Sequence, residues 1–543
     1  MRLSRRELIA LMLGAPAVAT GCSPPPVVPL HGELFGQSFD IGHRLRDGFR
    51  PRPADDQWRD VQVAIVGGGA AGLSAGRALL QGKCDDFVVL ELEPVAGGTS
   101  RSEKKGDFAY PWGAHYVPVP LADNVPLIRL FTEMGVVESL AADGSPIVAE
   151  QYLCRDPEER LFYQGEWIEG LYPATGASVD DHVQLKAFRE LIDTFAAWRD
   201  STGRRAFAIP TSLATDDKEI MELDKLSMAD WLRYEGFNSA RLHWLVDYSC
   251  RDDYGLSAET TSAWAGLLYF ASRLRAPGAD HQPLISWPEG NGRIINHLAE
   301  VVGPRLQTGM AVTQLTPVTS DRGDFVEVTC FNTQTQSVTG LRARHVIFAA
   351  PQFLAPRLIT EFTERTKRKT DEFEYGSWFV ANLHLKDRPK QQQGYPLCWD
   401  NVMFRSRSLG YVVATHQAGR DYGPTVLTWY YPFTESHTRE IREKLLKATW
   451  ADLADVVLTD LEVPHPQIRQ LVERLDIFRW GHAMIRPKPG FIASQQRREA
   501  RHPDGRIHFA NTDLSGVALF EEAFDHGCRA ADEVLSMLPQ DRV

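Results

Sequence analysis

The feature that most constrains the fold is a glycine-rich turn between a short apolar segment and a helical one. The apolar segment is Val61–Val66, "VQVAIV". It runs directly into Gly67-Gly68-Gly69-Ala70-Ala71-Gly72, and the helical stretch Leu73–Leu80 follows. This is a G-x-G-x-x-G pattern in the strand–turn–helix context that gives the pattern its meaning. The sequence therefore predicts a parallel α/β unit of the kind that binds a dinucleotide.

Each position of the turn has a physical role. Gly67 permits the tight turn, Gly69 lets the backbone approach a pyrophosphate, and Gly72 lets helix and strand pack closely. Ala70 and Ala71 begin the helix, whose N-terminus would face the phosphates. These five residues are therefore predicted to hold the pyrophosphate of the ligand.

An acidic residue ends the second apolar segment. "FVVLE" finishes at Glu91, nineteen residues after Gly72, where a carboxylate can accept hydrogen bonds from ribose hydroxyls. The same carboxylate would repel a 2′-phosphate, so NADP is disfavoured as the ligand. The residues alone predict a dinucleotide without identifying which one.

Further stretches, in chain order, resemble the flavin amine oxidase superfamily of FAD-dependent amine oxidases and phytoene desaturase-like oxidoreductases. Together they cover the chain from about residue 60 to its end, with a poorly matched middle. The stretches are "ELEPVAGGTSRS" (91–102), "WGAHYV" (112–117), "WPEGNGRIINHLAE" (287–300), "ARHVIFAAP" (343–351), "GRIHFANTD" (505–513) and "LFEEAFDHGCRAADEVL" (519–535).

The resemblance implies FAD as the cofactor and assigns residues to it. The stretch after Glu91 is similar to the family's Glu-x5-Gly-Gly extension, and "WGAHYV" is similar to the loop near the flavin ring. No cysteine stands near "RWGHAMIRPKPG" (479–490), where some relatives attach flavin covalently, so we expect non-covalent FAD. The additional cofactor-binding residues implied are Gly98, Thr99, Arg101, Gly113, Ala114, Val312, Asp513 and Phe520.

Two residues are candidates for the chemistry. The family position of His115 would put it on the substrate side of the flavin, able to orient or deprotonate substrate, and a hydrogen-bonded loop histidine is the alternative. Arg357 stands six residues after Pro351, where the family often carries a lysine beside the flavin. Arginine stays protonated and so cannot simply replace that lysine. The two alternatives are that it binds a substrate carboxylate or that it is a surface residue in a shifted loop.

The family's two aromatic walls around the amine are not evident in this sequence. Leu519 stands at one wall position, and the region of the other offers His482 and Ala483. We therefore expect the aromatic cage to be absent or rebuilt from other residues.

The predicted fold is α/β, a Rossmann-type FAD-binding domain that is discontinuous in sequence, with an inserted mixed α+β substrate domain. Residues 23–60 are expected to be a tether and an irregular arm without a core. The FAD-binding domain is assigned to 61–144, 284–351 and 475–543, and the substrate domain to 145–283 and 352–474.

The N-terminal stretch "SRRELIALMLGAPAVATGC", Ser4–Cys22, reads as an export signal. Paired arginines precede an apolar run too short to span a bilayer, an order that resembles twin-arginine signals. Cys22 follows Ala-Thr-Gly and so resembles a lipidation site, with plain cleavage nearby as the alternative. Residues 1–22 therefore predict engagement of an export machinery and a periplasmic protein, either soluble or anchored to a membrane through lipidated Cys22.

Charge and cysteine usage exclude some functions. The formal net charge is −12, and residues 1–21 carry three arginines and one glutamate, so removing them leaves −14. Such a balance argues against a nucleic-acid partner. The six cysteines after Cys22 show no C-x-x-C spacing, so no metal site is expected.

Three functions remain compatible with the sequence. The first choice is oxidation of an amine by hydride transfer to FAD, with re-oxidation by oxygen. The second is a desaturase-like or other flavin dehydrogenase that passes electrons to a quinone or another carrier. The third is a non-catalytic flavoprotein that binds a partner.

Overall fold

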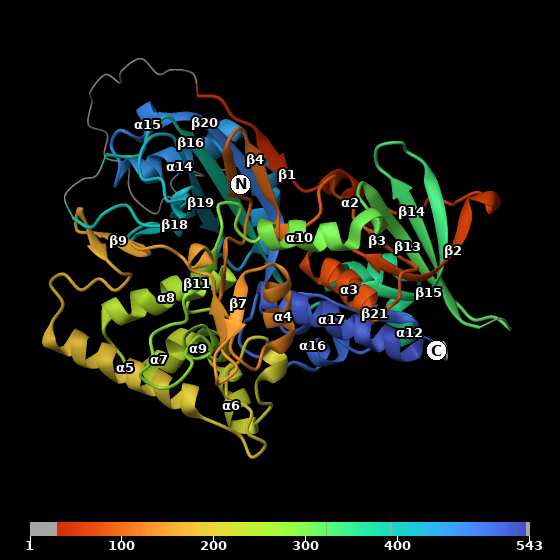
Figure 1. The fold of residues 1–543 in the computed structure, drawn as a ribbon, viewed down its shortest axis with the longest axis horizontal. Helices are drawn as coiled ribbons and strands as arrows, with labels where there is room; N and C mark the ends of the chain where they lie inside the picture. Colours follow the sequence, from red (N-terminus) through yellow and green to blue (C-terminus); the bar gives the residue numbers. More distant parts are fainter. Residues whose placement is uncertain (1–29, 322, 391–393, 539–543) are drawn as a thin grey trace.

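The computed structural model describes residues 30–321, 323–390 and 394–538. The predicted export signal, with Cys22, lies outside the described residues. Figure 1 shows two lobes, each built around one large sheet, with most of the helices α5 to α9 below the left-hand lobe. The arrangement confirms the mixed α/β class that the sequence predicts.

The right-hand lobe holds a seven-stranded sheet that contains the glycine-rich turn. Its strands β12, β3, β2, β15 and β21 run parallel, and β14 and β13 extend β15 in antiparallel fashion. Their bounds are β2 (Trp58–Val66), β3 (Phe87–Leu90), β12 (Leu306–Gln307), β13 (Met310–Val318), β14 (Phe325–Asn332), β15 (Val338–Phe348) and β21 (Ile507–Phe509).

The turn adopts the geometry that the glycines predict. β2 ends at Val66, Gly67 has a φ of +106°, and α3 (Ala70–Gln81) begins after Gly69 as its N-cap. A side chain on Gly72 would bring its Cβ within 1.9 Å of the carbonyl oxygen of Gly67. The third glycine is therefore required by the close packing of helix on turn, as predicted.

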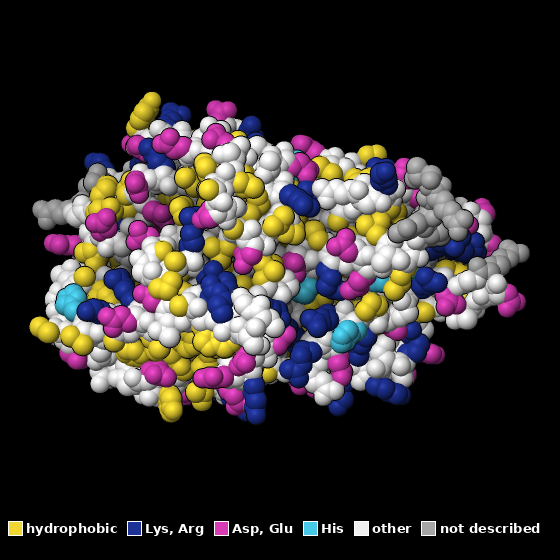
Figure 2. All heavy atoms as spheres, turned by 60° about the horizontal axis from the view of Figure 1, so that its bottom comes forward, with side chains coloured by type: hydrophobic (Ala, Val, Ile, Leu, Met, Phe, Trp, Pro, Cys, Tyr) yellow, Lys and Arg dark blue, Asp and Glu magenta, His cyan; other side chains and the backbone are white. Residues whose placement is uncertain are grey.

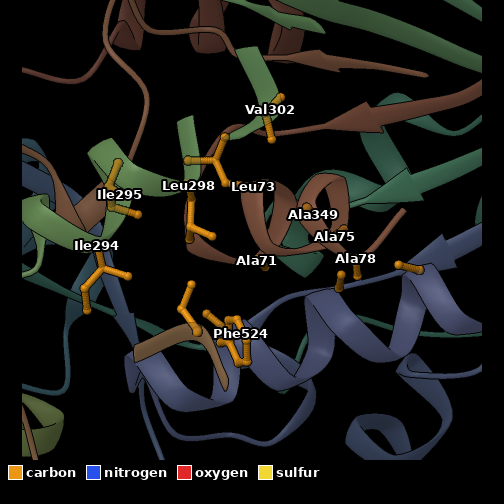
Figure 3. Packing of buried hydrophobic residues seen from close by; sticks show 14 of the residues in the cluster. Ala71, Leu73, Ala75, Ala78, Ile294, Ile295, Leu298, Val302, Ala349 and Phe524 are labelled. Carbon is orange, nitrogen blue, oxygen red and sulfur yellow. The ribbon is translucent and has the colours of Figure 1, made fainter. Parts of the chain in front are cut away.

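Helices α10 (Gly292–Val302) and α17 (Phe520–Met537) flank α3 and build the core of this lobe. Figure 3 shows apolar side chains from the three helices directed toward one another, including Leu73, Leu298 and Phe524. Gly527 permits the closest approach, because a Cβ there would lie 2.2 Å from the carbonyl oxygen of Ala71. This packing fixes the helix that begins at the phosphate-binding turn. α4 (Val125–Glu133) also contributes to this core.

The left-hand lobe holds an eight-stranded mixed sheet in the order β1-β20-β16-β19-β18-β17-β9-β10. Helices α13 and α14 pack on this sheet, and α5 and α7 to α9 form a separate apolar cluster. The strands are β1 (Leu34–Gly36), β9 (Glu159–Tyr163), β10 (Glu166–Glu169), β16 (Tyr375–Leu385), β17 (Asp400–Met403), β18 (Gly410–Val413), β19 (Thr425–Pro432) and β20 (Val472–Ile485).

The remaining elements are short hairpins and helices. The pairs are β4 (Ser102–Lys105) with β5 (Phe108–Pro111), β6 (Tyr116–Pro118) with β11 (Leu284–Ser286), and β7 (Val137–Leu140) with β8 (Pro146–Val148). The helices are α2 (Phe39–Arg46), α5 (Val179–Ala197), α6 (Lys218–Glu222), α7 (Met228–Tyr234), α8 (Ala240–Tyr254), α9 (Ala263–Ala271), α11 (Ala355–Leu358), α12 (Phe362–Thr366), α13 (Thr438–Lys447), α14 (Trp450–Glu462), α15 (Ile468–Leu471) and α16 (Gln495–Ala500).

Two predicted boundaries need correction. The sequence assigns the last FAD-binding segment from residue 475, but β20 pairs with β16 along Val472–Ile485 and so belongs to the substrate-lobe sheet. The arm before residue 60 is not irregular throughout, because β1 joins that sheet, α2 follows it, and Leu45 lies in a hydrophobic core. Both errors concern residues whose partners are far away in sequence.

On the face shown in Figure 2, Lys and Arg side chains are interspersed with Asp and Glu, and hydrophobic side chains gather at the lower left. Within the described ranges, no helix combines the length and apolar character needed to cross a bilayer. Nor do those ranges contain a group of three or more His, Cys, Asp or Glu side chains placed to hold a metal ion.

Candidate active site

A cavity of about 370 Å³ lies along the glycine-rich turn. It extends from the edge of the parallel sheet to the N-terminus of α17 and the inner face of β20. The predicted cofactor residues that line it are Gly67, Gly69, Ala70, Ala71, Glu91, Gly98, Thr99, Arg101, Ala114, Val312, Asp513 and Phe520. The fold therefore brings together predicted residues from six separate parts of the sequence.

Two predicted residues stand elsewhere. Gly72 packs against Gly67 beneath the turn, as described above. Gly113 lines a neighbouring second cavity, and a Cβ there would lie 2.2 Å from the carbonyl oxygen of Thr99. Gly113 is thus required by the close approach of two loop segments.

Glu91 is tied to the turn as well as facing the cavity. Its Oε2 accepts a hydrogen bond from the Gly68 N–H at 2.6 Å, and its Oε1 accepts one from the Glu93 N–H at 2.8 Å. Burial raises the pKa of Glu91, and these two hydrogen bonds oppose that effect. Each carboxylate oxygen keeps a second lone pair, so both can still accept a ribose hydroxyl.

The phosphate end of the cavity fits an anionic dinucleotide. A Cβ on Gly69 would meet no atom within 4 Å, so the backbone here borders open space. Arg101 lines the same cavity, and its buried Nε has no hydrogen-bond partner within the described chain. A helix N-terminus together with an unpaired guanidinium donor suits a pyrophosphate.

At the α17 end, Asp513 is buried and its Oδ2 accepts two hydrogen bonds. The donors are the Gln352 N–H at 2.8 Å and the Tyr375 hydroxyl at 2.5 Å. Burial raises the pKa of Asp513 to about 6. Among the described residues no hydrogen bond occupies Oδ1, which leaves that oxygen for a ligand hydroxyl.

The second cavity, of about 200 Å³, adjoins the first. The residues common to both linings mark where the two meet: Thr99, Ala114, Trp480, Ala483, Ala518, Leu519 and Phe520. A planar ring reaching from the dinucleotide cavity past these residues would form one wall of the second cavity.

The second cavity has aromatic walls, although not at the two positions where the family usually places them. Leu519 and Ala483 do line it, as the sequence indicates. The aromatic side chains instead come from other elements: Tyr116, Tyr248, Tyr269, Trp378, Trp399, Tyr430 and Trp480. Aromatic side chains therefore line this cavity from positions other than those two.

His115 lies among these aromatic side chains. Its ring centroid is 5.0 Å from that of Tyr430 and 5.2 Å from that of Trp399. Burial lowers the pKa of His115 to about 4, so the imidazole is neutral near pH 7. The Tyr430 hydroxyl donates to the Gly113 carbonyl oxygen at 3.0 Å, which holds this wall against the predicted flavin loop.

Arg357 lines neither cavity, although its neighbour Leu358 lines the first. It is exposed on the short helix α11, where Ala355 and Leu358 take the buried side and leave Arg357 facing outward. Its carbonyl oxygen accepts a hydrogen bond from the Arg50 guanidinium at 2.7 Å. The placement corrects the catalytic hypothesis for Arg357 and agrees with the surface alternative.

Sequence reasoning missed a group of carboxylates in the second cavity. One cation, Arg273, faces them, and its Nη2 donates to both oxygens of Asp253 at 2.9 and 2.8 Å. The lining therefore contains more carboxyl groups than cations. The six acidic residues in the lining are Glu158, Glu159, Asp252, Asp253, Asp400 and Glu521.

Three of these carboxylates converge from different elements. Glu159 begins β9 and pairs in register with Asp400, which begins β17, while Asp252 comes from α8. Burial raises the pKa values of Glu159 and Asp252 to about 7, with smaller contributions from acidic neighbours, chiefly Glu158 for Glu159 and Asp253 for Asp252. Burial and repulsion from Asp252 and Glu159 raise the pKa of Asp400 well above its ordinary value. No single stretch of sequence contains this group, so no local pattern predicts it.

Glu521 lies at the other end of the cavity. It follows Phe520, which borders both cavities, and its side chain is 7% exposed. Burial raises the pKa of Glu521 to about 7. Its carboxylate accepts a hydrogen bond from its own backbone N–H and none from any other described residue. A buried carboxyl group with such a pKa can exchange a proton near neutral pH.

Similar proteins include known oxidases. The peroxisomal N(1)-acetyl-spermine/spermidine oxidase of Bos taurus is 28% identical over 192 residues, 35% of this chain and 35% of that protein. Oxidoreductase PigB of Serratia sp. (strain ATCC 39006) is 24% identical over 300 residues, 52% of this chain and 42% of the relative. The matches thus span less than half the length of either curated relative.

Solved structures share the fold. Putrescine oxidase bound to putrescine superposes with a TM-score of 0.62 at 15% identity, covering 88% of this chain and 100% of that one. Cyclohexylamine oxidase from Brevibacterium oxydans IH-35A gives 0.60 at 17% identity, covering 88% and 99%. A fatty acid isomerase from P. acnes gives 0.60 at 16% identity with the same coverage.

A family model described as flavin containing amine oxidoreductase matches residues 70–535, most of the chain. The match covers the glycine-rich turn from its first helical residue, most of the lining of the first cavity, the whole lining of the second and most of α17. The chain therefore belongs to the family of flavin-containing amine oxidoreductases.

Proposed function

We propose that this protein is an FAD-dependent oxidoreductase that oxidises a cationic amine, with oxygen as the electron acceptor. The observation that carries the proposal is an aromatic cavity with an excess of carboxylates, adjoining a dinucleotide cavity. Bound non-covalently, FAD would accept a hydride from the carbon next to nitrogen, giving an imine, and its re-oxidation by oxygen would give hydrogen peroxide.

The carboxylates supply recognition of the substrate. Burial and acidic neighbours disfavour ionisation of Glu159, Asp252 and Asp400 in the empty cavity, and an ammonium group placed among them would favour their ionised forms and be attracted to them. Aromatic faces such as those of Trp399 and Tyr430 add attraction for the same cation and exclude water. The bovine relative oxidises acetylated spermine or spermidine, and the putrescine oxidase binds a diamine, which supports a cationic substrate.

The proton chemistry favours Glu521 over His115. A carbon–nitrogen bond is oxidised from the neutral amine, so a group near the reacting nitrogen must take its proton. An imidazole whose pKa is about 4 is a poor acceptor for an ammonium proton, whereas a carboxylate whose pKa is about 7 is well matched. We therefore assign proton acceptance to Glu521 and assign His115 the orientation of the amine through hydrogen bonding.

The desaturase-like alternative is less well supported. An apolar substrate would desolvate the carboxyl groups of the second cavity without offering them a charged partner. Similarity to a fatty acid isomerase concerns the fold alone at 16% identity. A non-catalytic role does not explain why an acidic cavity adjoins the dinucleotide cavity. The experiment below distinguishes this role from catalysis.

The test is anaerobic bleaching of the flavin absorbance by a panel of compounds. The panel comprises cyclohexylamine, α,ω-diamines of four to eight carbons, an acetylated polyamine, a polyene and a long-chain fatty acid. We expect rapid reduction by amines, faster with a diamine than with a monoamine of equal length, and slower reduction in Glu521→Gln. Reduction by the polyene alone would establish the desaturase-like function, and no reduction by any compound would leave a binding role.

The proposal includes export by the twin-arginine route and a periplasmic location. It is supported by the sequence of residues 4–22 and by the need to assemble the dinucleotide cavity from residues as distant as Gly67 and Asp513. Such a site exists only after folding, so FAD is loaded before a folded protein is exported. Lipidation of Cys22 would then anchor the mature protein to a membrane.

A further inference from the structure

Residues 34–46, which we call the N-terminal strap, lie outside the residues that the family model matches. They comprise β1 and α2. Figure 1 shows that they pass from the left-hand lobe to the right-hand lobe across the upper side of the molecule. The strap thus bridges the two lobes whose junction holds the dinucleotide cavity.

The first end of the strap is attached to the substrate-lobe sheet. β1 pairs in parallel with β20, in a register that places Phe35 opposite Phe478. Just before β1, the Glu33 N–H donates to Asp476 Oδ1 at 2.9 Å. Phe35 also packs against Trp112, with ring centroids 5.5 Å apart. Backbone pairing and aromatic packing therefore hold this end.

The second end is attached to the dinucleotide lobe. Leu45 is 7% exposed and lies in the core beneath the seven-stranded sheet. The Arg44 guanidinium lies 3.9 Å from the ring centroid of Phe49, which in turn packs edge-on against Phe331 of β14. Arg50 then donates to the carbonyl oxygen of Arg357 on α11. The strap is therefore fixed at both ends, in different lobes.

The strap also forms part of the cavity wall. Gln37, Gly42 and Leu45 all line the dinucleotide cavity. Ser38 donates to the Glu93 carboxylate twice, from its backbone N–H at 2.7 Å and from its hydroxyl at 2.9 Å. The Glu93 N–H in turn donates to Glu91, the predicted ribose-binding carboxylate. Two charge-assisted hydrogen bonds thus connect the strap to the segment that holds the ribose end of the ligand.

We propose that the N-terminal strap is part of the FAD site: it closes the cavity over the adenosine side and must detach before FAD can leave. It therefore sets the rate of FAD release, while the glycine-rich turn and Glu91 set most of the binding energy. The inference rests on the dinucleotide site and holds whichever substrate is oxidised. Its consequence is a cofactor that dissociates slowly although it is bound without a covalent bond.

The test measures FAD release from the purified holoenzyme by the rise in flavin fluorescence after rapid dilution. Deleting residues 1–46 removes the strap, and we expect release about 100-fold faster than in the full chain. Ser38→Ala removes one hydrogen bond to a charged carboxylate, and we expect release about tenfold faster, with Ser38→Thr, which keeps the hydroxyl, unchanged within twofold. Holoenzyme absorbance and circular dichroism confirm that each variant is folded and loaded at the start.

A double-variant comparison isolates the contact. If Ser38 acts through Glu93, then Ser38→Ala has no further effect on release in a Glu93→Ala background. Equal release rates for the full chain and the deletion variant would overturn the proposal. If the deletion variant does not fold, Ser38→Ala remains as the test, and FAD release at the same rate as from the full chain would then overturn the proposal.

Discussion

Replacing Glu159 with glutamine should stabilise the protein and weaken substrate binding at the same time. Glu159 is partly buried at the start of β9, and its carboxylate makes no hydrogen bond to a described residue. Its pKa is raised from 4.5 to about 7, first by burial and then by the neighbouring charges of Glu158 and Asp252. Glutamine keeps the shape and removes the charge, so the substitution tests the charge alone.

The magnitude follows from the linkage between protonation and folding. A carboxyl group with a raised pKa in the folded state costs nothing below about pH 4.5, and the cost grows until the pH passes about 7. One pKa unit corresponds to about 1.4 kcal/mol, so the ionised Glu159 destabilises the fold by about 3 kcal/mol at pH 8. Glu159→Gln should therefore raise stability by about that amount at pH 8 and by almost nothing at pH 4.5.

The effect on the substrate has the opposite sign. A diamine loses one carboxylate partner for its ammonium group in a cavity of low dielectric constant, so its KM should rise about tenfold or more while kcat changes little. The assay is thermal unfolding at pH 4.5 and pH 8 together with peroxide-coupled kinetics. The matched control is Glu166→Gln at an exposed position of the adjacent strand β10, which should change neither the unfolding midpoint nor KM. A lower midpoint at pH 8, or an unchanged KM, would refute the reasoning.

Three further outcomes are expected. Glu91→Ala removes the acceptor for the Gly68 and Glu93 N–H groups, so FAD affinity measured by equilibrium dialysis should fall at least 100-fold; full retention of FAD would count against the site. Arg357→Ala should leave turnover within twofold because the side chain is exposed, and a large loss would return Arg357 to the site. Replacing Arg5 and Arg6 with lysine should leave a folded, FAD-containing precursor in the cytoplasm, whereas Cys22→Ala should release soluble exported protein. Cell fractionation with flavin fluorescence checks both, and normal export of the lysine variant would contradict the signal assignment.

The dinucleotide half of the site could be predicted because its determinants are local. The turn from Gly67 to Gly72 needs only a strand before it and a helix after it, and both are evident within about twenty residues. Glu91 follows at a spacing that the next parallel strand imposes. In such a unit the sequence encodes the geometry directly, so Gly67, Gly69 and Glu91 line the cavity as expected.

The substrate half could not be predicted in the same way because it depends on tertiary pairing. Glu159 and Asp400 become neighbours only when β9 pairs with β17, and Asp252 joins them from α8. A lone acidic residue at the start of a strand is ordinary, so none of the three carries a signal by itself. The missed strap has the same origin, since the three-residue strand β1 is stabilised by partners more than 400 residues away.

Partial protonation of its carboxyl groups explains how an acidic cavity can be present in a stable fold. Near pH 7 the raised pKa values of Glu159, Asp252 and Glu521 mean that each of these carboxyl groups is protonated part of the time, which relieves repulsion and desolvation in the empty cavity. A cationic substrate favours the ionised forms and so displaces those protons as it binds. Binding should therefore release protons and strengthen as the pH rises from 6 toward 8, while the aliphatic amine stays charged. The same equilibrium leaves ionised carboxylates next to the bound ammonium, which is the protonation state that Glu521 needs to take up the amine proton.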